Sequence, residues 1–226
     1  MAMQRREVKH AEVVDDDHPQ PHASAWKGLV AIGILVLLLI AGAAYQSWKN
    51  RATIAQDRYN GFDFAQADGG LWVTRIQVRE QPYDIPFYYH PRDLEDIIVR
   101  DHDAHRLLTA RNRTVEQVFV SVDPDAGAKV AAIAGVEIAR LTGSKYGLLN
   151  LPTTGALTRP GNTTADYPVL TCRDATAQTV ILQFEQDALG NAIVRDGDCV
   201  ILFYQTPDDA VRVADRYAYL ILGIMP

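Results

Sequence analysis

The strongest pattern in the chain is a run of seventeen uncharged, mostly apolar residues from Gly28 to Ala44. Trp26 and Trp48 flank the run, and such amphipathic aromatic side chains favour the interface between a bilayer and water. At a helical rise of about 1.5 Å per residue, residues 26–48 span roughly 33 Å, enough to cross a hydrocarbon core of about 30 Å. The pattern therefore predicts a transmembrane helix at residues 26–48, with the lipid bilayer as its partner.

The residues before this segment form a long polar tail. Residues 1–25 include three consecutive aspartates, Asp15–Asp17, and have little apolar surface to bury, so we expect them to be disordered. Ala41-Gly42-Ala43 is typical of a cleavage site, and a cleaved signal peptide is therefore the alternative to a permanent anchor. Because the acidic tail is not a compact basic region of the kind that opens a signal peptide, we favour a retained anchor.

Beyond the anchor, a juxtamembrane segment at residues 49–59 leads into a globular region at residues 60–226. Helical character is expected to continue through residues 52–57 and to end at Asn60-Gly61. The predicted strands are 71–78, 83–89, 115–122, 146–151, 169–171, 179–184, 192–195 and 199–204. The predicted helical segments are 91–96, 125–141 and 207–222, and the predicted polar loop is 153–166. Strands that alternate with helices, together with two hairpins, predict an α/β domain in which helices pack on a mixed β-sheet, with α+β as the alternative.

The last predicted helix has the clearest pattern. The sequence Thr206-Pro207-Asp208-Asp209 supplies an N-cap, a rigid first turn and acidic residues at the positive end of the helix dipole. One face of the helix is apolar and includes Val213, Ala214, Tyr217 and Ile221. The opposite face carries Arg212, Asp215, Arg216 and Tyr219. We therefore expect the first face to lie on the sheet and the second to face away from it.

The charge of the chain bears on its partners and its orientation. Residues 49–226 hold 18 of the 22 basic and 23 of the 28 acidic residues, a net charge of −5. This balance argues against nucleic acid and against an anionic lipid surface as the main partner of the domain. Four basic residues lie on the tail side of the apolar run, and three, Lys49, Arg51 and Arg58, flank it on the other side. This difference favours a cytoplasmic N-terminus and a C-terminal domain outside the cell membrane.

The chain contains two cysteines, Cys172 and Cys199, both in the large domain. An even number of cysteines in an exported domain favours a disulfide, which agrees with the orientation above. Two buried free thiols are the first alternative and a catalytic thiol is the second. No histidine follows His105, so a cysteine–histidine pair would need a partner from the first half of the chain.

Two histidine-containing stretches are candidate binding sites, each with a simpler interpretation. Asp101–His105 places His102 and His105 on one helical face, a spacing that can hold zinc, but it lacks the further ligands of a zinc signature. A solvated polar face is the favoured reading there. His90 lies in an aromatic stretch that could form a binding lip, although aromatic strands more often pack in a core. No catalytic, cofactor or metal residue is assigned, and glycosylation at Asn112 or Asn162 is left open.

Glu137 interrupts the pattern of its own helix. It lies at the centre of an apolar stripe that includes Val130, Ile133, Ile138 and Leu141. A carboxylate there must find a partner, reach the open end of the stripe or hold a proton. Arg140, one turn later, makes a structural ion pair the favoured interpretation, and a buried functional carboxylate is the alternative.

Three short stretches stand out together: residues 85–97, with the motif Pro-Phe-Tyr-Tyr-His-Pro, residues 136–140, and the C-terminal end from Asp198. They resemble a family of uncharacterised single-pass membrane proteins of small-genome archaea. The likeness covers most of residues 60–226. It implies an archaeal envelope setting, and it supplies no activity, substrate or site residue.

The leading hypothesis from the sequence is a non-enzymatic, membrane-anchored binding or assembly domain outside the cell, with a protein or other envelope component as its partner. It rests on the anchor, the acidic domain and the lack of a nucleophile–base motif. One alternative is a membrane-tethered hydrolase, metal-dependent or not, that uses Glu137 or the Asp101–His105 stretch. A structural subunit of a larger membrane complex is the other.

Overall fold

The computed structural model describes residues 30, 32–43, 56–110, 112, 114–127, 129–161 and 166–226. The chain divides into two compact units, residues 1–53 and 54–226. In the first unit, residues 30 and 32–43 are helical, and the described residues include no helix of the length and apolar character that a membrane span requires. The predicted tail at residues 1–25 and the rest of the predicted span lie outside the described part.

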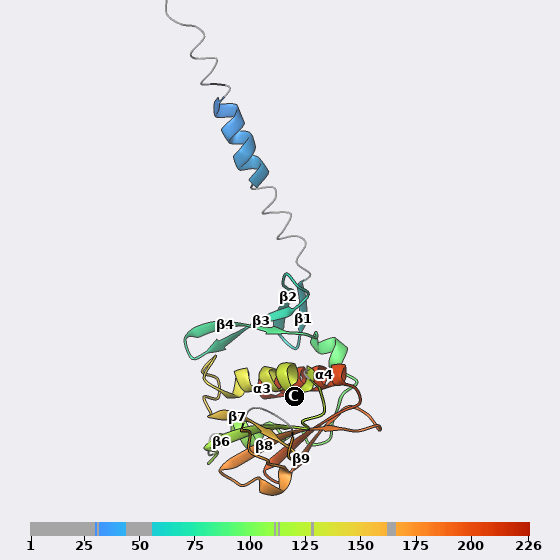
Figure 1. The fold of residues 1–226 in the computed structure, drawn as a ribbon. Coiled ribbons are helices and arrows are strands. Elements are labelled where there is room, and N and C mark those ends of the chain that lie inside the picture. The colour runs from blue at the N-terminus through green and yellow to red at the C-terminus, as the bar shows by residue number, and fades with distance from the viewer. Residues whose placement is uncertain are drawn as a thin grey trace, which may run out of the picture. The chain divides into compact units, whose positions relative to one another are not determined.

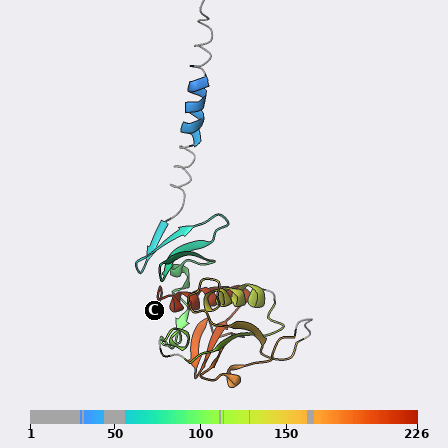
Figure 2. The same ribbon diagram turned by 90° about the vertical axis from the view of Figure 1, so that its left-hand side faces the viewer.

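The second unit is built in three layers, which two perpendicular views show in the same order (Figures 1 and 2). A four-stranded sheet forms one outer layer, two helices form the middle layer, and a six-stranded sheet forms the other outer layer. The mixed sheet with helices packed on it is therefore confirmed. The second sheet, on the other side of the helices, was not predicted.

The four-stranded sheet is an antiparallel meander in which each strand pairs with the next along the chain. Its strands are β1 (Gln56–Tyr59), β2 (Phe62–Gln66), β3 (Trp72–Val78) and β4 (Gln81–Phe87). Asn60 and Gly61 both have positive φ and form the two-residue turn between β1 and β2, a conformation that this residue pair adopts readily. The predicted helix through residues 52–57 is wrong where the structure describes it, because that turn pairs residues 56–59 with β2.

A short connection leads from this sheet into the other. It contains a 3-10 turn, η1 (Pro91–Leu94), the two-residue strand β5 (Ile98–Val99) and one helical turn, α2 (Arg106–Thr109). The Nδ1 atom of His90 accepts a hydrogen bond from the Arg92 amide and so caps η1. Leu94 and Leu108 are buried, so the connection packs into the core and does not hang over the surface.

The six-stranded sheet has the order β5-β9-β10-β8-β6-β7. Its longer strands are β6 (Gln117–Val122), β7 (Thr153–Leu157), β8 (Thr179–Gln186), β9 (Ala192–Asp196) and β10 (Cys199–Tyr204). Neighbours within β10-β8-β6-β7 are parallel, whereas β9 pairs with β10 as an antiparallel hairpin across Gly197. The carboxyl ends of four parallel strands consequently lie at one edge of the sheet.

The helices of the middle layer are α3 (Gly135–Thr142), preceded by a π-helical stretch η2 (Lys129–Ala134), and α4 (Pro207–Ile221). The predicted start of α4 is confirmed, since Thr206 and Asp209 form a reciprocal capping box. The predicted start of the earlier helix at residue 125 is wrong. The Asp123 side chain accepts from the Asp125 amide and Gly127 has positive φ, so the chain turns before the helix begins.

Two further predicted elements are corrected between α3 and β8. Residues 146–151 form bends and no strand, because Gly147 and Asn150 adopt positive φ. The strand lies instead at β7, inside the predicted polar loop, where Thr153–Leu157 pair with β6. Threonines suit a strand as well as a loop, and the pairing partner decides between the two.

The core lies on both faces of the helix layer. Val213, Ala214 and Tyr217 of α4 are fully buried with Leu182 and Val200 of the six-stranded sheet, as the apolar face of that helix predicts. The other face of α4 was expected to face away from the sheet. The four-stranded sheet covers it, and Asp215, Arg216 and Tyr219 are consequently buried. Residues with polar groups thus lie between the two outer layers.

Candidate functional site

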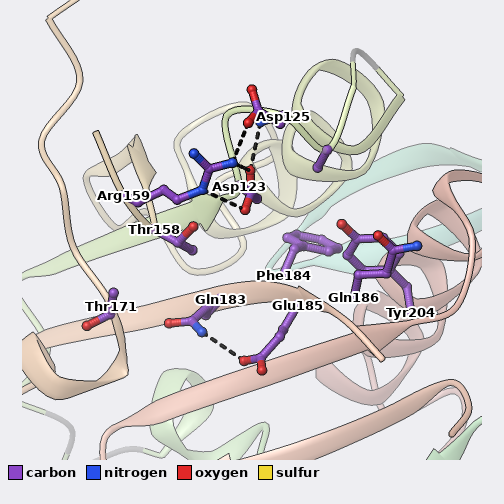
Figure 3. A pocket seen from close by; sticks show the side chains of 11 residues that line it. Asp123, Asp125, Thr158, Arg159, Thr171, Gln183, Phe184, Glu185, Gln186 and Tyr204 are labelled. Carbon is purple, nitrogen blue, oxygen red and sulfur yellow. Dashed lines mark hydrogen bonds and ion pairs between the residues drawn. The ribbon is translucent and has the colours of Figure 1, made fainter. Parts of the chain in front are cut away.

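The candidate site is a crevice at the carboxyl ends of the parallel strands, with a volume of about 500 Å³ (Figure 3). From β6 the chain passes through α3 to β7 on one side, and from β8 it passes through β9 to β10 on the other side. The point between β6 and β8 is therefore a switch point of the topology. In open α/β sheets, ligands bind outside the carboxyl ends of strands at such points.

One wall of the crevice is an ion-paired group that we call the crevice cluster: Asp123, Asp125 and Arg159. Asp123 follows β6 directly, and the parallel pairing of β6 with β7 continues to Thr158, whose amide donates to the Val122 carbonyl at 3.0 Å. This continuation places Arg159 beside Asp123, with Nε–Oδ2 and Nη2–Oδ1 distances of 3.1 and 2.9 Å. Arg159 also donates to the Asp125 carboxylate.

The opposite wall comes from the end of β8. The side-chain amide of Gln183 donates to the Glu185 carboxylate at 3.0 Å, and its Oε1 atom accepts from the backbone amide of Cys172 at 3.0 Å. Thr171, next to Cys172, also lines the crevice. The predicted disulfide between Cys172 and Cys199 is confirmed, and it ties this wall to the start of β10. The disulfide thus holds one side of the crevice in place.

The floor of the crevice is less polar. Phe184 and Tyr204 line it and are almost fully buried, with ring centroids 6.5 Å apart. Burial and the charge of Asp123 raise the pKa of Tyr204, so its hydroxyl is protonated at neutral pH. Gln186 lies beside Tyr204 at the end of β8 and donates to the Gln205 carbonyl at 2.9 Å.

The electrostatics of the crevice are acidic. Burial raises the pKa of Asp123, but hydrogen bonds from the Asp125 amide and from Arg159 outweigh it, and the pKa lies below its usual value. Hydrogen bonds to both aspartates raise the pKa of Arg159. With Glu185, the crevice presents three carboxylates and one guanidinium, alongside amide and hydroxyl groups. Such a lining can accept many hydrogen bonds and favours a neutral or cationic ligand over an anion.

The residues that the sequence singled out lie elsewhere. Glu137 does not line the crevice; it is 7% exposed on α3 and forms an ion pair with Arg140. Asp101, His102 and Asp103 are exposed in a turn before α2 and do not share a helical face, although His105 Nδ1 contacts the His102 carbonyl. Within the described ranges, no group of three His, Cys, Asp or Glu side chains is arranged to hold a metal ion.

His90 is part of the core of the four-stranded sheet. It is 3% exposed, and its ring centroid lies 4.6 Å from that of Trp72 and 5.0 Å from that of Phe64 in edge-on contacts. Burial lowers the pKa of His90, although Asp57 opposes this effect. The ring is therefore neutral at neutral pH and packs against its neighbours, so it forms no open lip.

The crevice residues were missed in the sequence because a helix was predicted to begin at residue 125, directly after Asp123. One signal could have found them: Asp123 follows the buried strand β6, and Glu185 lies near the end of the buried strand β8. Two asparagines were candidates for glycosylation. Asn162 lies outside the described residues, and Asn112 lies in a turn.

The chain matches no protein-family model, no curated protein and no solved structure.

Proposed function

We propose that the protein is a non-enzymatic, membrane-anchored binding domain of the cell envelope that takes a polar ligand in the crevice. The observation that carries this proposal is the crevice itself, with its converging polar side chains at the switch point between β6 and β8. The ligand bears hydroxyl groups and a cationic amine, as a free amino sugar such as glucosamine does. The acidic lining favours the amine, and the glutamines and threonines suit hydroxyls.

The proposed location rests on two features, one near the N-terminus and one in the globular domain. The uncharged run from Gly28 to Ala44, flanked by tryptophans, supports an anchor at residues 26–48, with the tail in the cytoplasm. The disulfide between Cys172 and Cys199 supports an oxidising compartment for the globular domain, since the cytosol keeps thiols reduced. Together they support a domain that lies outside the cell and stays at its membrane.

Three sugars of similar shape and different charge test the ligand class. The full chain in detergent micelles is titrated with glucosamine, glucose and glucuronate while amide NMR signals are followed. Glucosamine is expected to shift the signals of Asp123, Arg159 and Glu185 at the lowest concentration, glucose at a higher one, and glucuronate last. The order follows from the acidic lining.

A matched pair of variants shows whether the crevice is responsible. Glu185→Gln removes one carboxylate from the crevice. It should therefore reduce the difference between the concentrations at which glucosamine and glucose shift the signals. Asp84→Asn removes an exposed carboxylate that pairs with Arg75 on the other sheet, and it should leave the preference unchanged. If none of the sugars shifts the crevice signals, or if both variants respond alike, the proposed ligand class is wrong.

A further inference from the structure

Asp215 is a carboxylic acid in the interior of the molecule. It lies on α4 with 0% exposure, between the helix layer and the four-stranded sheet. Its Oδ2 atom accepts hydrogen bonds from the amides of Tyr88 and Tyr89, at 2.8 and 2.9 Å. Its Oδ1 atom has no hydrogen-bond partner among the described residues. A fully ionised carboxylate would leave that oxygen charged and unsolvated, which is costly in a protein interior.

Asp215 is one of three side chains of the helix layer that bind the backbone at the end of β4. The Tyr219 hydroxyl donates to the Tyr89 carbonyl at 2.8 Å, and Arg140 donates to the Pro86 carbonyl. The Phe87 ring, between these attachment points, lies 4.3 Å from the Tyr219 ring. These contacts attach the four-stranded sheet to the helix layer, so the state of Asp215 bears on how firmly the two layers are joined.

Two carboxyl groups feel the charge of one guanidinium at this attachment. We call Glu137, Asp215 and Arg140 the buried cluster; Glu137 pairs with Arg140, and the charges of both act on Asp215. The charged and titratable side chains near the cluster include Lys145 after α3, Tyr89 after β4, Asp93 in η1, and Arg212, Arg216 and Tyr219 on α4. With both carboxyls ionised, the buried cluster carries a net charge of −1.

The neutral form of Asp215 removes that excess charge. Burial raises the pKa of Asp215 from 3.8 to about 8, the hydrogen bond from the Tyr89 amide opposes this, and the charge of Glu137 adds to the rise. Burial also raises the pKa of Glu137, although Arg140 opposes it. At neutral pH Asp215 therefore keeps its proton, which removes the excess negative charge.

We propose that the buried cluster is a proton-controlled clasp between the helix layer and the four-stranded sheet. With the proton bound, the helix layer holds the end of β4, and loss of the proton loosens this attachment. Water reaches the ionised carboxylate only when the end of β4 moves away from α4. The controlling ligand is the proton, and the moving part is the four-stranded sheet. The clasp does not depend on a ligand in the crevice.

The direction of the pH dependence follows from the raised pKa. In the open clasp Asp215 is solvated and its pKa returns towards 3.8, whereas in the closed clasp it is about 8. Between these two values, opening releases one proton, so the opening constant rises about tenfold per pH unit. The stabilisation is complete below 3.8, declines as the pH rises, and is lost above about 8.

Hydrogen exchange at the Tyr88 and Tyr89 amides measures the opening directly. In the full chain in detergent micelles, their exchange rates are recorded between pH 5 and pH 8, about the range of the linkage, and divided by the intrinsic rates at each pH. We expect the corrected opening constant to rise with pH in the parent. In Asp215→Asn it should be flat, because the amide keeps the acceptor oxygen and cannot ionise. Parallel curves for the two proteins overturn the proposal.

Two more variants keep the test decisive. Asp84→Asn changes an exposed carboxylate on β4 and should reproduce the slope of the parent. Glu137→Gln removes the neighbouring negative charge, so the rise should level off at a lower pH than in the parent. If Asp215→Asn does not fold, an unchanged curve in Glu137→Gln contradicts the clasp by itself. Sugar binding is measured at the amides of Asp123, Arg159 and Glu185, and opening of the clasp is measured at those of Tyr88 and Tyr89. The two proposals can therefore fail independently.

Discussion

The crevice cluster and the buried cluster have the same composition, two carboxylates and one arginine. The pKa of an aspartate is nevertheless lowered in the first and raised in the second. The side chain of Arg159 in the crevice is 49% exposed, whereas that of Arg140 in the interior is 8% exposed. In the crevice the arginine's hydrogen bonds help to lower the pKa of Asp123 despite partial burial. In the interior, burial dominates and raises the pKa of Asp215 to about 8.

Exposure therefore decides whether a group of carboxylates and an arginine keeps its charges or binds a proton. Exposed ion pairs are solvated and contribute little to folding, so their charges are free to meet a ligand. Buried pairs have lost their water, so removal of one member leaves an uncompensated charge. We therefore propose that the crevice cluster binds the ligand. The buried cluster joins the four-stranded sheet to the helix layer.

The largest expected effect is that of Arg140→Met. The change leaves Glu137 without its cation and removes the donor to the Pro86 carbonyl. Loss of one member of a buried ion pair costs about 3–5 kcal/mol, and we expect the free energy of unfolding to fall by this amount. Urea denaturation of the full chain in detergent measures it. A loss as small as that of an exposed pair would show that the two clusters do not differ.

The disulfide gives the next largest effect, on the crevice side of the comparison. Cys172 and Cys199 are separated by 27 positions, and opening a loop of that size lowers stability by about 3 kcal/mol. Replacing both by alanine should lower the unfolding free energy accordingly and shift the amide signals of Thr171 and Gln183, while Tyr88 keeps its signal. Two freely alkylated thiols in protein from its native membrane would contradict both the bridge and the proposed location.

The smallest effect is expected for Arg159→Met, the exposed counterpart of Arg140→Met. The same change in side-chain shape breaks ion pairs that water already screens, so the loss should be below about 1 kcal/mol and should shrink as salt is added. The preference for glucosamine over glucose should increase, because Arg159 is the one cationic side chain among the described residues that line the crevice. A loss equal to that of Arg140→Met would mean that exposure does not separate the clusters.

Local patterns in the sequence predicted much of the fold. The hairpin of β3 and β4, the strands β8, β9 and β10, and the capped helix α4 each carry their own signal of alternation or capping within a few residues. Of the elements that were wrong, β7 depends on a distant partner, because Thr153–Leu157 become a strand through pairing with β6. β1 pairs with β2 across the Asn60-Gly61 turn, so its signal was local, and the error was to take that turn as the end of a helix.

The same reason explains why the two clusters were only partly predictable. Glu137 stood out because it interrupts an apolar stripe, which is a local signal. Asp215 lay on the polar face of α4 and gave no such signal, because the sheet that buries this face comes from the other end of the domain. The crevice depends on the strand order, which brings Asp123 and Glu185 to one edge.

The most direct test of the difference between the clusters is a carbon-13 NMR titration of the aspartate side-chain carboxyls in the full chain. Both groups are read in one sample. We expect the carboxyl carbon of Asp215 to titrate near pH 8 and that of Asp123 to titrate below its ordinary value of 3.8. If Asp215 titrates at or below 3.8 as well, it holds no proton at neutral pH, and the proposed difference between the two clusters is contradicted.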